Sequence, residues 1–236
     1  MHRDIEVGEV LPVRTTPMTS SRGDSMPRLA EDLVLLLLDD TSGRSTVDLG
    51  RRHRAVGSAV LLELVRAGRV TIVSAPDVAE ARVHVTDNSP TGDQILDVAL
   101  GKLAPKPLKV GWAAENLGHD CWLPLLDLLA ADGAVRLEQQ RVLGVIRTRT
   151  WPAVDGTRET LVRDAIAAAL RGAKPDEETA TLITILHGVG AVPGVADRPT
   201  RGRAEEIARA GWAAGPLRDA FHGLDPAQIF VLLAAS

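Results

Sequence analysis

The centre of the expected fold is the segment RAVGSAVLLELVRAGRVTIV, residues 54–73. Between Val56 and Val65 almost every residue is apolar, and Glu63 is the main charge inside the run. A helix that is apolar on nearly all sides belongs in the centre of a domain rather than on its rim. Gly68 can end this helix in a left-handed cap, and the β-branched residues of 70–73 predict a strand directly after it.

A basic run lies just ahead of this central helix. It consists of Arg51, Arg52, His53 and Arg54 and is the densest cluster of positive charge in the chain. The planar guanidinium group of arginine binds phosphate through paired N–H donors. The run is therefore a candidate anion site at the entrance to the core helix, and a solvated basic helix start is the alternative interpretation.

Composition limits the class of protein. A chain of 236 residues can form one large domain or two small ones. The net charge of −4 disfavours a dedicated nucleic-acid-binding protein. A single cysteine, Cys121, excludes an intrachain disulfide, and no apolar run approaches the roughly 20 residues needed to cross a bilayer. The excess of arginine over lysine is typical of a GC-rich bacterial genome, and we expect a soluble cytoplasmic protein.

Periodicity and turn signals predict a mostly α protein: a single compact helical domain built around the buried central helix, with two small peripheral β-hairpins. Residues 1–26 are expected to be a flexible tail and 27–236 the domain. We expect further helices over 29–38, 94–103, 110–117, 121–131, 159–170, 177–189, 201–214 and 226–235. The expected strands are 44–49, 70–73 paired with 82–85 around a turn at 76–77, and 135–137 paired with 143–148 around a turn near 139–140.

Nothing in the sequence predicts catalysis or a metal site. The chain has no G-x-S-x-G elbow and no phosphate-binding loop motif. Cys121 is expected to be a small core residue. One cysteine cannot form a zinc cluster, and no two of the histidines have i, i+4 spacing: His2, His53, His84, His119, His187 and His222. We therefore expect a protein that is not an enzyme and that uses no metal and no cofactor.

A second hypothesis comes from the order helix 121–131, Gly133 and an arginine-bearing hairpin, which is similar to a winged helix. The wing would carry Arg136, Arg141, Arg147 and Arg149, and such wings contact DNA phosphates. The preceding helix offers no polar recognition face, so a nucleic-acid-binding regulator remains the alternative interpretation.

Five segments, in this order and at this spacing, resemble the Golgi phosphoprotein 3 family, in its bacterial, actinomycete-type form. They are LAEDLVLLLLDD (29–40), GSAVLLELVRAGRV (57–70), SPTGDQILDVAL (89–100), ADGAV (131–135) and TLITILHGVG (181–190). The resemblance runs from about Pro27 to the C-terminus. It implies a compact helical domain. Eukaryotic members are non-enzymatic adaptors that bind phosphatidylinositol 4-phosphate on Golgi membranes and help to retain glycosyltransferases there.

The resemblance also implies where a lipid headgroup would bind. The tryptophan and one arginine of the family pocket align with Asp48 and Gly57, and two further arginines align with His119 and Trp122, so none of the four is kept. The candidate headgroup residues are therefore Arg51, Arg52, His53, Arg54, His119 and Trp122. We expect an anionic-lipid-binding peripheral membrane or adaptor protein at the inner face of the membrane, with a protein partner and without selectivity for the 4-phosphate. The sequence leaves the oligomeric state open.

Overall fold

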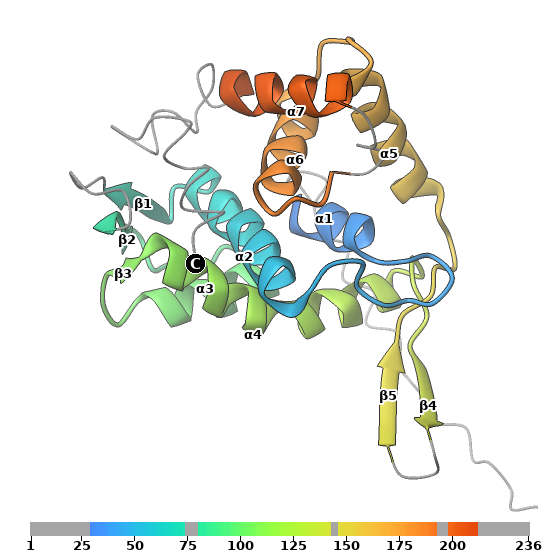
Figure 1. Ribbon diagram of the computed structural model, residues 1–236. Coiled ribbons are helices and arrows are strands. Elements are labelled where there is room, and N and C mark those ends of the chain that lie inside the picture. Colours follow the sequence, from blue (N-terminus) through green and yellow to red (C-terminus); the bar gives the residue numbers. More distant parts are fainter. Residues whose placement is uncertain (1–28, 74–79, 143–145, 193–197, 212–236) are drawn as a thin grey trace, which may run out of the picture.

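The molecule is mostly helical and carries two small antiparallel sheets, as the sequence predicts (Figure 1). The computed structural model describes residues 29–73, 80–142, 146–192 and 198–211. In chain order the elements are α1 (Leu29–Leu37), α2 (Leu49–Arg66), β1 (Val70–Val73), β2 (Arg82–Val85), α3 (Gln94–Leu103), β3 (Leu108–Lys109), α4 (Val110–Ala131), β4 (Glu138–Val142), β5 (Ile146–Thr150), α5 (Thr157–Leu170), α6 (Glu177–Gly188) and α7 (Arg198–Gly211).

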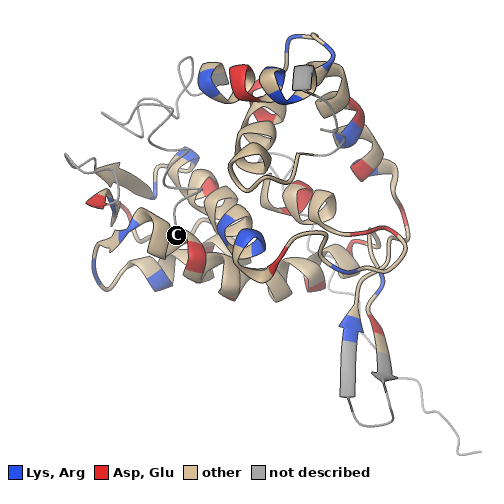
Figure 2. Cartoon of the chain, viewed as in Figure 1, with Lys and Arg blue, Asp and Glu red and all other residues tan. Residues whose placement is uncertain are grey.

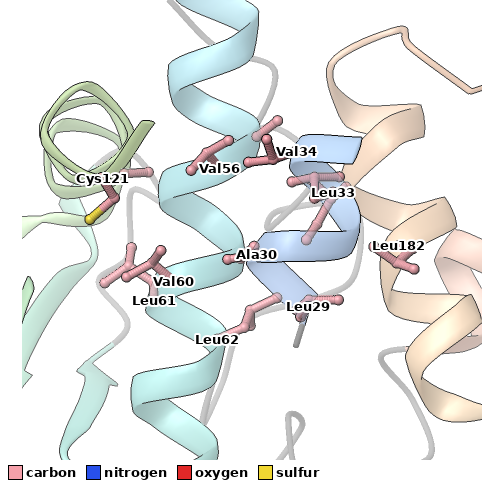
Figure 3. Close-up of a cluster of buried hydrophobic side chains, with 14 of the residues drawn as sticks. Leu29, Ala30, Leu33, Val34, Val56, Val60, Leu61, Leu62, Cys121 and Leu182 are labelled. Carbon is pink, nitrogen blue, oxygen red and sulfur yellow. The ribbon is translucent and has the colours of Figure 1, made fainter. Parts of the chain in front are cut away.

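Helix α2 is the centre of the hydrophobic core. Every residue from 55 to 65 is buried, because α1 and α4 pack against different sides of the helix. Figure 3 shows Leu33 of α1, Cys121 of α4 and Leu182 of α6 in this cluster of apolar side chains. Gly68, two residues after the last residue of α2, has a φ of 68°, and the Arg69 N–H donates to the Leu64 carbonyl at 2.9 Å. The predicted central helix and its glycine cap are confirmed.

The start of α2 differs from the prediction. The strand expected over 44–49 does not form, and its residues contribute only an isolated bridge between Leu38 and Ser45. Instead, Asp48 is the N-cap of α2, and its side chain accepts a hydrogen bond from the Arg51 N–H at 3.0 Å. Aspartate is among the preferred N-cap residues because its carboxylate satisfies a free amide of the first turn. The basic run therefore forms the first turns of the helix rather than the segment ahead of it.

Helix α4 is continuous, whereas the sequence predicted two helices over 110–117 and 121–131. The glycine and charged residues between them do not break the helix, because Gly118 lies against α2 and is held there by packing. Pro124 lies inside α4 and does not end it. Tertiary packing has overridden the local breaking signals.

The first sheet confirms one hairpin and extends it. Strands β1 and β2 pair antiparallel with Val70 opposite Val85, and the short strand β3 adds to β2. The turn predicted at 76–77 lies outside the described residues. Asp93 caps α3 by accepting hydrogen bonds from the Ile95 and Leu96 N–H groups.

The second hairpin is confirmed as a hairpin, but its predicted register is wrong. Val142 pairs with Ile146, so the chain reverses around 143–145, and the turn predicted at 139–140 lies inside β4. Alternation of side chains alone does not fix which residues turn. Figure 1 shows this hairpin projecting from the end of the molecule opposite the three-stranded sheet.

The C-terminal helices lie within a few residues of their predicted bounds. On α3, Leu100 is buried and Val98 is exposed. The predicted tail 1–26 and helix 226–235 lie outside the described residues, and the division into tail and domain remains a prediction. No helix in the described part of the chain has the length and apolar character needed to cross a membrane.

Candidate functional site

Two glycines bring the basic start of α2 against the middle of α4. A Cβ atom on Gly57 would lie 1.8 Å from the Ala114 carbonyl oxygen, and one on Gly118 would lie 1.8 Å from the His53 carbonyl oxygen. Only glycine fits at both places, so the two backbones touch. The contact places residues 52–54 beside Glu115, His119 and Trp122, and Figure 2 shows the arginine-bearing first turns of α2 over α4.

Arg52 lies on the face of Trp122. The centre of its guanidinium group is 4.3 Å from the ring centroid, and the Trp122 side chain is buried beneath it. The Arg52 Nη2 atom is 3.5 Å from His53 Nε2. A cation–π contact of this kind holds the guanidinium in one orientation. Burial lowers the pKa of Arg52, but an arginine remains charged at neutral pH.

His53 is an internal residue of the site rather than an exposed ligand. It is 6 % exposed, its Nδ1 lies 3.6 Å from Glu115 Oε1, and its ring meets the His119 ring edge-on at 5.3 Å. Burial, reinforced by the charge of Arg52, lowers the pKa of His53 below its usual value. The imidazole is therefore neutral at pH 7. His119 is exposed, and its Nδ1 lies 3.0 Å from Asp120 Oδ1.

Arg51 and Arg54 each face a carboxylate. The Arg51 Nε atom is 3.0 Å from Asp48 Oδ2, and the Arg54 Nη1 atom is 4.0 Å from Glu115 Oε2. The hydrogen bond from the Arg51 N–H is the main reason that the pKa of Asp48 lies below its usual value. Three guanidinium groups thus meet two carboxylates, which leaves the site with a small positive excess.

The structure brings together the residues predicted from the sequence. Arg52, His53, Arg54, His119 and Trp122 lie along the contact of α2 with α4, and Arg51 lies beside them near Gly190, after the end of α6. We call this set, with Arg51 included, the basic cluster.

The acidic partners of the basic cluster, Asp48, Glu115 and Asp120, were not predicted from the sequence. A signal for Asp48 exists, because an aspartate three residues ahead of a basic turn is a typical helix cap. Glu115 lies on another helix, and nothing in the sequence indicates that it reaches His53 and Arg54.

One family-aligned position is closed by the fold. Gly57 stands where the resemblance places a pocket arginine, but it touches the backbone of α4, so no side chain fits there. At a second family-aligned position, Asp48 is already engaged as the N-cap of α2.

The other candidate residues behave differently. Arg136 of the proposed wing is paired with Glu138 at 2.5 Å, Arg149 is exposed, and the side chains at 141 and 147 lie outside the described part. Cys121 is buried in the core, and burial raises its pKa to about 12. Within the described ranges, no three His, Cys, Asp or Glu side chains gather as a metal site.

Comparison with known proteins gives one match. A family model described as Golgi phosphoprotein 3 (GPP34) matches residues 29–223, which include every described helix and strand. No curated protein matches the chain.

Proposed function

Because the chain belongs to the Golgi phosphoprotein 3 family, we propose that it binds anionic lipid headgroups as a non-enzymatic peripheral membrane or adaptor protein. The observation that supports this proposal most directly is the basic cluster, in which Arg52 is braced on Trp122 and two further arginines lie within one helical turn. Guanidinium groups held in place lose little freedom when they bind a phosphate.

The binding is expected to be weak and to follow charge rather than headgroup identity. A basic residue near an anionic surface contributes about 1 kcal/mol, and the attraction fades within a Debye length of roughly 8–10 Å. Asp48 and Glu115 offset part of this attraction, since both lie against the arginines. With Gly57 closed to any side chain, the pocket arginine that the family resemblance implies at this position is missing, so we expect no selection of one phosphoinositide.

Vesicle sedimentation with a charge-neutralised variant tests the proposal. The variant Arg51→Gln/Arg52→Gln/Arg54→Gln should lower the affinity for phosphatidylglycerol vesicles by up to roughly 100-fold at low salt. A matched control, Arg171→Gln/Lys174→Gln/Arg201→Gln, removes three positive charges from exposed positions elsewhere. Its affinity for the vesicles should lie closer to that of wild type than to that of the first variant. An equal loss of affinity in both variants would show that binding depends on the net charge of the protein and not on the basic cluster.

Neutralising Asp48 should act in the opposite direction. Asparagine caps a helix about as well as aspartate, so Asp48→Asn keeps α2 intact while removing a negative charge beside Arg51. Binding to anionic vesicles should become tighter, with no change for neutral vesicles. A variant that binds anionic vesicles no better than wild type would place the headgroup away from the start of α2.

A DNA mobility-shift experiment on the same proteins addresses the alternative function. The lipid proposal predicts no shift that depends on Arg136 or Arg149. A shift abolished by replacing these two arginines, together with unchanged vesicle binding by the variant with glutamine at 51, 52 and 54, would favour the nucleic-acid-binding interpretation instead.

A further inference from the structure

The outer face of α4 carries a stripe of exposed residues that the fold leaves uncovered. Trp112, Asn116, His119 and Leu123 follow one another at steps of four, three and four residues, so they lie on one side of the helix. Trp112 is 56 % exposed and Leu123 is 46 % exposed, which makes them two of the large apolar side chains that face solvent. We call these four residues the α4 stripe.

The α4 stripe continues into the basic cluster. His119 belongs to both, because its ring meets the ring of His53 at 5.3 Å. At the other end, Lys109 is exposed and precedes Trp112 by one turn, and its Nζ atom lies 2.5 Å from Glu80 Oε1. Because Lys109 is paired with Glu80, the positive excess near the two apolar side chains comes from the arginines of α2 beside the middle of the stripe.

We propose that the α4 stripe lies on the surface of an anionic membrane, with Trp112 and Leu123 entering the headgroup region on either side of His119. This inference rests on the proposed function and adds to it a specific orientation of α4. Tryptophan favours the boundary between headgroups and acyl chains, where its ring is apolar and its N–H remains hydrated. Cations beside the apolar residues match the negative potential of such a surface.

The size of the apolar surface fits a membrane better than a second copy of the chain. Trp112 and Leu123 are eleven residues apart, about 16 Å along the helix, and the residues of the stripe between them are polar. A stable protein interface buries roughly 800 Å² on each partner around a continuous apolar centre. Two isolated side chains do not supply such a centre, but each can enter the headgroup region independently.

Quenching by brominated lipids tests this orientation. The background variant Trp212→Phe removes a tryptophan outside the described residues, while Trp122 and Trp151 stay buried as internal references. In phosphatidylglycerol vesicles with brominated acyl chains, fluorescence of the bound protein should be quenched. Most of the quenching should disappear when Trp112→Phe is added to this background.

An affinity measurement gives a second readout. The variant Trp112→Ser/Leu123→Ser should bind anionic vesicles with an affinity at least roughly tenfold lower than that of wild type. The reason is that the two substitutions remove apolar surface that would be transferred from water into the membrane. The matched control, Val154→Ser/Leu161→Ser, removes exposed apolar side chains elsewhere and should bind as wild type does.

The outcomes separate the two proposals. If wild type does not sediment with anionic vesicles, the proposed function falls, and this inference falls with it. If wild type sediments but Trp112 fluorescence stays unquenched, the inference alone is overturned. The same holds if Trp112→Ser/Leu123→Ser binds as wild type does. A stable dimer in ultracentrifugation that Trp112→Ser/Leu123→Ser dissociates would also overturn it, since the stripe would then be an interface between copies of the chain.

Discussion

Glu63 lies in the middle of the core with its carboxyl group turned towards the start of α1. Its Oε1 atom accepts a hydrogen bond from the Ala30 N–H at 3.1 Å. Burial raises the pKa of Glu63 to about 8, although the hydrogen bond from Ala30 acts in the opposite direction. The side chain is therefore largely protonated at neutral pH, which reduces the cost of burying it among leucines and valines.

This raised pKa predicts a pH-dependent stability. In the unfolded chain Glu63 titrates near its usual value of 4.5, so between that pH and about 8 the folded state holds a proton that the unfolded state has lost. The contribution of Glu63 to the free energy of unfolding is fully present below the pKa of the unfolded chain. It is lost as the pH rises through the pKa of the folded state, and the total loss is roughly a few kcal/mol. Urea denaturation of wild type and Glu63→Gln at pH 5.5, 7 and 8.5 measures it.

The glutamine variant serves as the reference for that experiment. An amide resembles the protonated carboxyl group in shape but does not titrate, so Glu63→Gln should lose this part of the pH dependence and be more stable than wild type at pH 8.5. If both proteins lose the same stability between pH 5.5 and 8.5, Glu63 is not the group that titrates.

Among the site residues, the sequence shows the cations and hides their partners. The basic run stands out because its members are adjacent in the chain, and His119 and Trp122 were found through the family resemblance. The pairing of Glu115 with His53 and Arg54 depends on how two helices meet. Local sequence carries no information about such a contact.

Among the elements, the contact of α2 with α4 explains both the site and the main errors of prediction. Gly118 breaks helical periodicity in the sequence and therefore predicts an interruption of α4. In the structure it is the residue that lets α4 approach α2, and the helix continues through it. The cap at Gly68 and the pairing of β1 with β2 were predictable because both depend on neighbouring residues.

Gly118→Ala should therefore separate the two helices. The added methyl group would fall 1.8 Å from the His53 carbonyl oxygen, so α2 or α4 must move, at a cost of roughly 2–4 kcal/mol in the free energy of unfolding. Vesicle binding should weaken as well, because the first turns of α2 shift away from Trp122. Thermal melting and sedimentation measure the two effects.

Gly101→Ala is the matched control for this substitution. Gly101 is an exposed position within α3, and a Cβ there meets nothing within 4 Å. The change should leave binding unaltered and stabilise the protein slightly, by up to about 1 kcal/mol, because alanine favours helix. A Gly118→Ala protein as stable as this control would show that the helices do not touch as described.

In the whole molecule, a chain with net charge −4 presents a local site of the opposite sign. The basic cluster and the α4 stripe share His119, so they form one continuous surface on α2 and α4. The overall charge opposes approach to an anionic membrane, whereas the local cations favour one orientation of contact. Binding should therefore weaken steeply with added salt.

If the start of α2 faces the membrane, a spin label placed there should become shielded from water when the protein binds. Leu49 and Leu161 are both exposed leucines near the first turn of a helix, on α2 and α5. Cys121 is buried and its pKa is about 12, so it should not compete for a thiol-reactive nitroxide. Leu49→Cys and Leu161→Cys therefore form a matched pair for labelling.

The measurement is the accessibility of each nitroxide to a water-soluble paramagnetic nickel complex, by power-saturation electron paramagnetic resonance, with anionic or neutral vesicles. We expect anionic vesicles to lower the accessibility of the label at Leu49→Cys and to leave that of the label at Leu161→Cys unchanged. Neutral vesicles should change the accessibility of neither label. Membrane-bound protein whose label at Leu49→Cys stays fully accessible, or whose label at Leu161→Cys is the one protected, would contradict the account.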